Sequence, residues 1–213
     1  MKKTIVFAVA TFASLGLHAE QGKTYWGIEF GAANLENHSK KVETRLVNAY
    51  GGTASVTNDS NIPTIKFFAG YQYSENLDLE LGYFKRSSAN INFSGVTDGS
   101  IAYTGDGNTK SSGFEYAVNI RPSIASGLND LYFRIGGHSS KLDLNGYLYV
   151  NNSLVSSSIN SYSGSGALYG FGYDHKLNQL TKVRYSAVKY SSIGGESGYD
   201  ETVYSIGIIK KFD

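Results

Sequence analysis

Eight segments of the chain alternate between large apolar residues and small or polar residues with a period of two. This is the period of a β-strand, in which successive side chains point to opposite faces of the sheet. No long pattern with the 3.6-residue period of a helix follows Glu20. The sequence therefore predicts an all-β fold whose strands lie in Tyr25–Asn34, Pro63–Tyr73, Leu77–Lys85, Gly113–Pro122, Leu131–His138, Gly166–Tyr173, Leu180–Lys189 and Thr202–Phe212.

The connections between these segments alternate between long and short. The long ones are Leu35–Asn61, Arg86–Ser112, Asp143–Ser163 and Tyr190–Asp200, and the short ones are Ser74–Asn76, Ser123–Asp130 and Asp174–Gln179. A transmembrane β-barrel has short turns at its periplasmic rim and longer loops at its outer rim. Tilted strands of about 9–11 residues are long enough to cross a bilayer. We therefore predict an eight-stranded antiparallel transmembrane β-barrel with both termini in the periplasm.

Two of the long connections contain apolar residues on both sides of a turn sequence. Ile91, Phe93, Ile101 and Tyr103 flank Asp98-Gly99, a pair typical of tight hairpins. Tyr147–Val150 and Leu154–Ile159 flank Asn151-Asn152 in the same way. These segments are expected either to extend the wall as hairpin ribbons or to be flexible loops, and the sequence leaves both open.

The two faces of the predicted strands differ in a way that suits a membrane. One face carries glycine and charged residues, which fit the narrow lumen of an eight-stranded barrel, and such a lumen is just wide enough to be filled by side chains. The charged residues are expected to form a lumenal ion-pair network, acting as a plug rather than as an ion gate; they are Glu29, Lys66, Glu80, Glu115, Arg121, Arg134, Lys182 and Arg184. A water-soluble barrel or sandwich with the faces reversed is the alternative.

The opposite face is apolar and rich in aromatic residues. Rings that carry a polar group are suited to the boundary between lipid and water. The residues expected to face lipid or to form this girdle are Trp26, Phe30, Phe67, Tyr71, Tyr73, Tyr83, Phe114, Tyr116, Phe133, Tyr169, Phe171, Tyr173, Tyr185 and Phe212.

The N-terminus has the pattern of a secretory signal peptide. Lys2 and Lys3 precede the apolar run Ile5–Leu17, and His18-Ala19 ends it. The run is shorter than the roughly 20 residues of a spanning helix, although a retained anchor is the alternative. We expect a signal at residues 1–19, cleaved near Ala19, and a barrel domain at residues 20–213, exported to the outer membrane of a Gram-negative cell.

The composition excludes other classes of protein. The chain has no cysteine, so disulfides cannot stabilise it, and its 17 Tyr, 11 Phe and 25 Gly with only 2 Pro favour strands. Its formal net charge is +1 without a basic block, so nucleic acid is not an expected partner. No cofactor or metal site is expected.

Several of these segments resemble the OmpA/OmpX-like family of eight-stranded outer-membrane β-barrels. The run Phe68–Tyr73 followed by Leu79–Tyr83 resembles the paired "GYQ" and "E-x-GY" motifs of that family. Tyr132–Gly137, Val183–Tyr185 and Ser205–Phe212 look like its fifth, seventh and closing strands. The resemblance implies assembly by the outer-membrane machinery that reads the closing strand, and contact with outer-membrane lipid and lipopolysaccharide. The size and the loops are also similar to accessory colonisation factors.

The leading functional hypothesis is adhesion, colonisation or host interaction through the outward loops. These loops offer aromatic residues among Ser, Asn and Gly, a mixture suited to adaptable contacts with a host-surface ligand: Tyr50, Phe93, Tyr103, Tyr147, Tyr149 and Tyr162. A narrow ion channel and a purely structural protein are the alternatives. A lipid-modifying enzyme built on His138-Ser139-Ser140 is less expected because His138 falls on the lumenal face, and we predict no enzyme activity and no catalytic residues.

Overall fold

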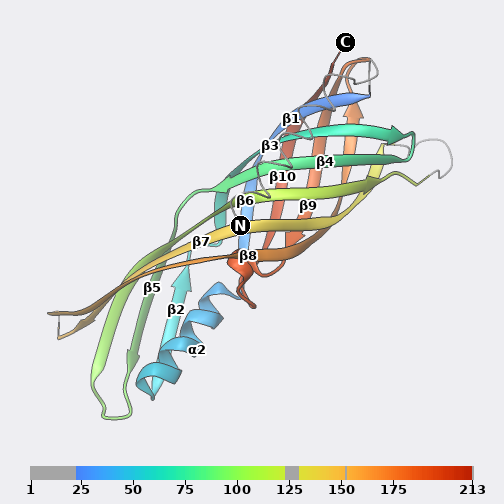
Figure 1. Ribbon diagram of the computed structural model, residues 1–213. Coiled ribbons are helices and arrows are strands. Elements are labelled where there is room, and N and C mark those ends of the chain that lie inside the picture. Colours follow the sequence, from blue (N-terminus) through green and yellow to red (C-terminus); the bar gives the residue numbers. More distant parts are fainter. Residues whose placement is uncertain (1–22, 123–129, 152, 213) are drawn as a thin grey trace.

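Eight antiparallel strands close into a ring in the computed structural model, which describes residues 23–122, 130–151 and 153–212 (Figure 1). The strands are β1 (Thr24–Glu36), β3 (Asn61–Ser74), β4 (Leu77–Arg86), β6 (Ala102–Ile120), β7 (Leu131–Val150), β8 (Ser153–Lys176), β9 (Thr181–Tyr190) and β10 (Asp200–Lys211). Each pairs with its neighbours in this order, and β1 pairs with β10 to close the ring. The predicted all-β, eight-stranded barrel is confirmed, and all eight alternating segments coincide with these strands.

Three strands continue well beyond the ring at the end opposite the short turns. β6, β7 and β8 have 19, 20 and 24 residues. Their outer halves are joined by β5 (Ala89–Val96), which pairs with β6, and by β2 (Thr53–Asn58), which pairs with β5. The result is an open five-stranded sheet in the order β2-β5-β6-β7-β8. We call this sheet, together with helix α2 (His38–Tyr50), the extension; it occupies the lower left of Figure 1.

Both predicted hairpin ribbons are part of the extension. Gly95 pairs with Tyr103 across the first turn, and Tyr149 pairs with Leu154 across the second. Asn151 has a φ of 50° in that second turn, a left-handed conformation that asparagine tolerates well. Of the two readings that the sequence left open, the ribbons are therefore correct, because each turn is flanked by residues that pair in register.

Helix α2 was not expected from the sequence. The sequence identified Leu35–Asn61 only as a long connection, and 13 of its residues form this helix. Val42 and Arg45 line a cleft against the sheet, whereas Thr44 and Asn48 are exposed. The helix is stabilised by packing on one side, which a short sequence rich in polar residues does not reveal.

Different kinds of side chain fill the two halves of the ring. The half near the short turns contains charged side chains, described below. The half near the extension contains a closed apolar cluster in which Phe84, Leu142, Leu168 and Tyr199 are almost completely buried. The 3₁₀ turn η1 (Ile193–Gly195) lies over this cluster and contributes Ile193 to it. The mouth of the barrel is therefore closed by apolar packing.

Two predictions concern segments outside the described residues. The signal peptide at residues 1–19 is one, and most of the short turn Ser123–Asp130 is the other. The other two short turns are confirmed, since β3 and β4 are separated by two residues and β8 and β9 by four. In residues 23–122, 130–151 and 153–212, no helix is long and apolar enough to cross a membrane.

Candidate functional site

A continuous network of ion pairs fills the barrel lumen. Its centre is Glu80 on β4, which accepts a hydrogen bond from Arg184 Nη1 at 2.6 Å and another from Arg134 Nη1. Arg134 also donates to Glu115 Oε1 at 2.6 Å, and Lys66 Nζ lies 3.3 Å from the same oxygen. These side chains are at most 7% exposed, so burial of the charges is compensated by direct pairing.

The network continues toward the short turns through two aspartates. Arg184 Nε donates to Asp174 Oδ1 at 2.7 Å, and Arg121 Nη2 donates to Asp174 Oδ2 at 2.7 Å. Arg121 also pairs with Asp78. At the other end of the network, Lys66 Nζ lies 3.0 Å from Glu29 Oε1. A chain of alternating charges thus crosses the lumen from β1 to β8.

The structure places seven of the eight predicted lumenal charges in the buried interior. Lys182 is the exception, because it is half-buried and lines a small cavity near the short turns with Asp78 and Asp174. Four charged residues of the interior were missed: Asp78, Arg86, Asp174 and Glu201. When these four are added to the eight predicted residues, Lys182 included, the lumen has six acidic residues (three predicted and three missed) and six basic ones (five predicted and one missed). The charges are therefore balanced. Alternation would have found all four: Asp78 occupies an inward position inside the predicted strand Leu77–Lys85, and the other three occupy inward positions one residue beyond a predicted strand.

The filled lumen leaves little space for solvent. One cavity, bordered by Glu29, Lys66 and Arg86, has a volume of about 10 Å³. The cavity beside Asp78 and Lys211 has a volume of about 20 Å³. Each is about large enough for one water molecule. Charged side chains therefore occupy most of the lumen around these two cavities.

A second charged pair lies at the boundary with the apolar cluster. Arg86 Nε is 2.7 Å from Glu201 Oε2, and its guanidinium lies 4.2 Å from the ring centroid of Phe84 and 4.7 Å from that of Tyr190. Ser111 Oγ donates to Glu201. This pair connects β4, β6 and β10 and is enclosed by aromatic rings.

The His138 and Ser140 side chains meet, but they meet inside the protein. His138 Nδ1 lies 3.1 Å from Ser140 Oγ, and Nε2 lies 2.9 Å from the carbonyl oxygen of Ser191. The amide of Gly194 donates to Ser140 Oγ at 2.9 Å. Since both side chains are buried beneath η1, neither reaches the outer wall where a lipid substrate would lie. In the described residues no group of three or more His, Cys, Asp or Glu could hold a metal ion.

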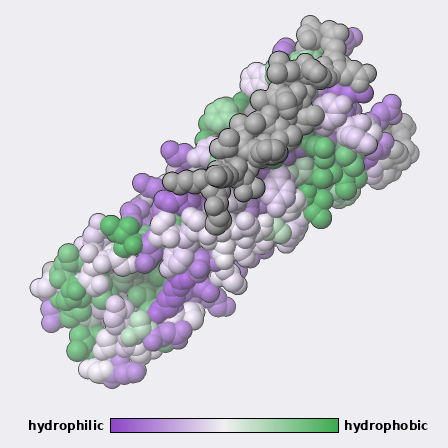
Figure 2. All heavy atoms as spheres, viewed as in Figure 1, coloured by the Kyte–Doolittle hydropathy of each residue, from purple (hydrophilic) through white to green (hydrophobic). Residues whose placement is uncertain are grey.

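The outer wall of the ring carries the predicted aromatic belt. Of its 14 residues, Tyr71 and Tyr173 are half-buried, and the other twelve are exposed, from 39% for Tyr83 to 69% for Tyr73. A protein surface in water rarely carries so much contiguous apolar area. Figure 2 shows part of this apolar wall at the upper right.

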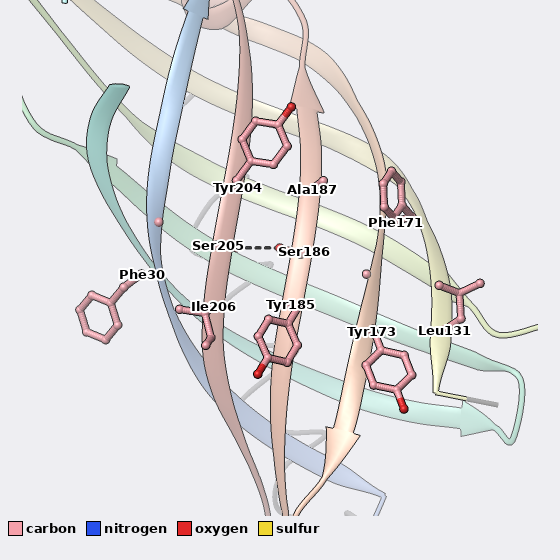
Figure 3. Close-up of a pocket in the computed structure, with 12 residues that line it drawn as sticks. Phe30, Leu131, Phe171, Tyr173, Tyr185, Ser186, Ala187, Tyr204, Ser205 and Ile206 are labelled. Carbon is pink, nitrogen blue, oxygen red and sulfur yellow. Dashed lines mark hydrogen bonds between the residues drawn. The ribbon is translucent and has the colours of Figure 1, made fainter. Parts of the chain in front are cut away.

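A groove of about 520 Å³ crosses this wall over β8, β9 and β10 (Figure 3). Ala187 on β9 has the smallest outward-pointing side chain in the groove, and the rings of Tyr204 and Phe171 lie on either side of it. Tyr204 and Phe171 are the register partners of Ala187 on the two neighbouring strands. The gap therefore results from one small residue in a row of aromatic ones.

The extension contains a separate cleft between α2 and the inner face of the sheet. Its volume is about 140 Å³, and apolar residues such as Ile91 and Phe93 lie beside amide side chains at its rim. Arg45 of α2 reaches across it, pairs with Glu196 at 2.8 Å and lies over the rings of Tyr162 and Tyr199. The cleft therefore joins apolar and hydrogen-bonding groups on one concave surface.

His38 anchors the beginning of α2 below this cleft. Its ring is fully buried and meets the ring of Tyr199 edge-on, with centroids 4.8 Å apart. Neither ring nitrogen has a hydrogen-bond partner among the described residues. Burial, reinforced by the positive charge of Arg86, lowers the pKa of His38 to about 4, while Asp200 opposes this shift. Burial also raises the pKa of Tyr199.

The predicted loop aromatics lie in the extension but are not equally accessible. Tyr50 and Tyr147 are exposed, and Phe93, Tyr149 and Tyr162 are half-buried. Tyr103 is a correction: it is 3% exposed, so it cannot serve as a contact residue at the surface. Its ring packs against that of Tyr50, and its hydroxyl donates to the carbonyl oxygen of Thr53.

The extension also has two strand edges that pair with no further strand among the described residues. β2 is the last strand of the sheet on one side. On the other side, the part of β8 from Ser153 to Ser163 pairs with β7 but not with β9, whose pairing begins at Leu168. This edge has no charged residue, and Val155 and Ile159 are 55% and 83% exposed. An uncharged open edge is a template for pairing with another chain.

The family model described as "Outer membrane protein beta-barrel domain" matches residues 4–212. Among solved structures, Ail, the attachment invasion locus protein of Yersinia pestis, is similar with a TM-score of 0.51 at 11% identity, over 91% of this chain and 100% of that chain. OprG of Pseudomonas aeruginosa has a TM-score of 0.44 at 14% identity, over 91% of this chain and 98% of that one. The N-terminal barrel of OprF from the same species has a TM-score of 0.41 at 12% identity, over 90% and 100%. No curated protein sequence matches the chain. The likeness to the Yersinia structure is one of fold.

Proposed function

Because the chain belongs to the family of outer membrane proteins with a β-barrel domain, we propose that it acts in attachment at the bacterial surface, with the extension as its recognition surface. Barrels of the outer membrane have their short turns in the periplasm and their long connections outside. The extension is then extracellular, and the plugged ring anchors it in the membrane.

The observation that carries the proposal is that the long connections fold into a platform of their own. A protein that only seals or stabilises the membrane needs no helix packed on five strands beyond the bilayer. Residues such as Ile91 and Leu144 face α2 within this platform, and the platform keeps both a cleft and open strand edges. A rigid surface of this kind can bind a partner with less loss of conformational entropy than flexible loops.

The open edge of β8 supports the same role. An extended segment of a host-surface protein can add to such an edge through main-chain hydrogen bonds. Apolar residues gather at this far end of the molecule, at the lower left of Figure 2. The name of the Yersinia pestis protein, an attachment invasion locus protein, agrees with a role in attachment.

The test compares adherence with and without the extension. The wild-type protein and a variant in which tight turns replace residues 38–58, 89–109 and 144–161 are displayed on a non-adherent laboratory strain. Heat-modifiable migration on gels verifies that each barrel has folded. Bacteria with the wild-type protein are expected to bind cultured epithelial cells at least tenfold more than bacteria with the variant. Equal binding by the two strains refutes the proposal.

A second comparison tests the edge itself. In Val155→Lys/Ile159→Lys, two charges are added to the open edge, a substitution that natural edge strands use to prevent pairing. Leu177→Lys is the matched control, because it adds charge to an exposed apolar position at the opposite end of the barrel. Adherence should fall for the first variant only. If both variants adhere like the wild type, the β8 edge is not the contact surface.

A further inference from the structure

We infer that the cleft between α2 and the sheet of the extension binds one neutral sugar ring at the end of a surface glycan. This inference rests on the proposed attachment function, because it names the chemical class that the extension recognises. The cleft combines an apolar centre of small volume, hydrogen-bonding groups from separate parts of the chain, and a balanced charge. A pyranose ring has the matching properties, since it presents C–H groups on its faces and hydroxyl groups around its rim.

The centre of the cleft is apolar and is kept open by glycines. The ring of Phe93 lies across β6 because its register partner there is Gly105, where a Cβ atom would lie 2.1 Å from the Cζ atom of the ring. Gly107, at the next inward position of β6, has Gly146 on β7 as its register partner. Apart from its chain neighbours, a Cβ atom on Gly146 would have nothing nearer than a backbone oxygen 4.0 Å away. The space above Gly146 is therefore open, and Phe93 and Leu144 offer apolar surface to the C–H groups of a sugar.

The volume of the cleft, about 140 Å³, selects a small occupant. Sites for drug-sized ligands have volumes of about 300–1,000 Å³. This cleft has the room of about five water molecules, at about 30 Å³ each. That is space for one sugar ring and not for two. Ser158 and Asn160, which line the cleft on β8, are exposed, so the rest of a glycan can leave the cleft over this strand.

Hydrogen-bonding groups reach the cleft from β8 and from α2. On β8, Asn160 Nδ2 donates to Ser158 Oγ at 2.8 Å. This bond leaves the amide oxygen of Asn160 free to accept and the hydroxyl of Ser158 free to donate. From α2, Arg45 Nη1 donates to the hydroxyl oxygen of Tyr162 at 3.4 Å, and Tyr162 can still donate its own hydroxyl hydrogen. A ligand in the cleft thus meets both donors and acceptors.

Tyr199 contributes a hydroxyl group that lacks a partner within the protein. The residue lines the cleft and is fully buried, and its hydroxyl makes no hydrogen bond with a described residue. A buried polar group without a partner costs free energy, so a ligand that supplies the missing hydrogen bond gains affinity. The hydroxyl groups of a sugar can bind Tyr199 and Asn160 from different points of one ring. An apolar side chain of a peptide would leave Tyr199 unpaired.

The balanced charge of the cleft favours a neutral sugar over an acidic one. Among the described residues that line the cleft, Arg45 alone is charged, and its Nη2 lies 2.8 Å from Glu196 Oε2. An acidic sugar such as sialic acid would compete with Glu196 for the guanidinium group and would bring its carboxylate close to that of Glu196. A neutral sugar can form hydrogen bonds to the pair without separating it.

The test measures sugar binding directly, by saturation-transfer-difference NMR on the purified, folded protein in a detergent without sugar groups. The neutral probes are the methyl glycosides of glucose, galactose, mannose and N-acetylglucosamine. N-acetylneuraminic acid represents the acidic sugars, and N-acetyl-leucine amide represents the apolar side chain of a peptide.

One variant fills the cleft without a clash. Gly146→Leu places a side chain in the open space described above. Gly99→Leu is the matched control, because Gly99 lies in the turn between β5 and β6, where a Cβ atom would meet only Thr97 Oγ1, at 3.7 Å. Both variants add the same side chain to the extension, but only the first adds it to the cleft.

A second pair of variants removes an amide group. Asn160→Ala takes it from the cleft, and Asn92→Ala takes one from an exposed position on the opposite face of the sheet. Heat-modifiable migration verifies that the barrel of each variant has folded. The distance between spin labels at Asn48 and Ser157 verifies that α2 remains docked.

At least one neutral glycoside should bind the wild-type protein with a dissociation constant of about 1 mM, a value typical of a ligand of this size. Gly146→Leu should abolish this binding, and Asn160→Ala should weaken it about fivefold through the loss of one hydrogen bond. Gly99→Leu and Asn92→Ala should bind like the wild type. The assignment is overturned by the absence of binding to every neutral glycoside, by unchanged binding in Gly146→Leu, or by tighter binding of N-acetylneuraminic acid or N-acetyl-leucine amide.

Failure of this inference and failure of the attachment function give different results. If removal of the extension abolishes adherence but no neutral glycoside binds, the sugar assignment is wrong and the attachment role stands. If a neutral glycoside binds in the cleft but adherence does not depend on the extension, the sugar site stands and the attachment role is wrong.

Discussion

Replacing Glu80 by glutamine removes a negative charge from the most enclosed part of the lumen. Glu80 accepts hydrogen bonds from Arg184, Arg134 and the hydroxyl of Tyr25, and it is 2% exposed. Removing one partner of a buried ion pair costs about 3–5 kcal/mol because the remaining charge stays buried without compensation. Here Arg184 keeps Asp174 and Arg134 keeps Glu115, so the cost should lie near the lower limit, about 3 kcal/mol.

The assay is equilibrium unfolding in urea of the barrel refolded in lipid vesicles, followed by heat-modifiable migration. Asp143→Asn is the matched control, because Asp143 pairs with Lys141 at 2.7 Å where the two side chains are 39% and 54% exposed. A pair with that exposure contributes about 0.2–1 kcal/mol at most. If Glu80→Gln destabilises the barrel no more than Asp143→Asn does, the lumenal network does not hold the strands in register and the reasoning is wrong.

Three further predictions concern the extension, the wall and the lumen. Burial lowers the pKa of His38 from 6.5 to about 4, so the docking of α2 keeps its full stability above pH 6.5 and loses about 3 kcal/mol by pH 4. The distribution of distances between spin labels at Asn48 and Ser157 should therefore broaden as the pH falls through that range. In His38→Phe the distribution should stay narrow. Gly70→Val should destabilise the barrel, because even a Cβ atom there would lie 2.2 Å from the ring of Tyr25 and would push this buried ring away from Glu80, and the temperature at which heat-modifiable migration is lost should fall. Planar bilayer recordings of the wild type should show no conductance above background because charged side chains fill the lumen; a steady ion current would contradict the plug.

The barrel could be predicted from the sequence because a wall with lipid on one side and a narrow lumen on the other imposes strict alternation. Phe67 and Phe68 illustrate this alternation, because the two adjacent phenylalanines point to opposite faces. Phe67 is exposed on the wall, and Phe68 packs in the lumen against Tyr25. The residues at strand ends were harder to assign. Asp174 was read as part of a turn, yet β8 continues to Lys176 and places it in the ion-pair network.

Helix α2 was missed although Asn37 before it and Gly51 after it are residue types that commonly flank a helix, because the other signals of a helix start are weak. Asn37, the residue before it, has a left-handed φ of 60° and makes no side-chain capping hydrogen bond, and the first turn has no acidic residue. Glu and Asp in the first turn are among the marks that identify a helix start in a sequence. The partners that stabilise α2, among them Tyr199 and Glu196, come from the far end of the chain, so the interaction exists only after the barrel has closed.

The same inward positions carry charges in the ring and apolar residues in the extension, and the change has a physical cause. Inside the ring, β6 and β7 face other strands across a narrow lumen, and each charge, such as Glu115 or Arg134, finds a partner there. Beyond the ring no opposite wall remains, so α2 takes its place and inward positions such as Ile91 and Leu144 are apolar. Each region is therefore filled by its own partners, the ring by ion pairs and by the apolar cluster at its mouth, and the extension by a helix. Changes in the extension can then alter what the protein recognises without disturbing the barrel that holds it in the membrane.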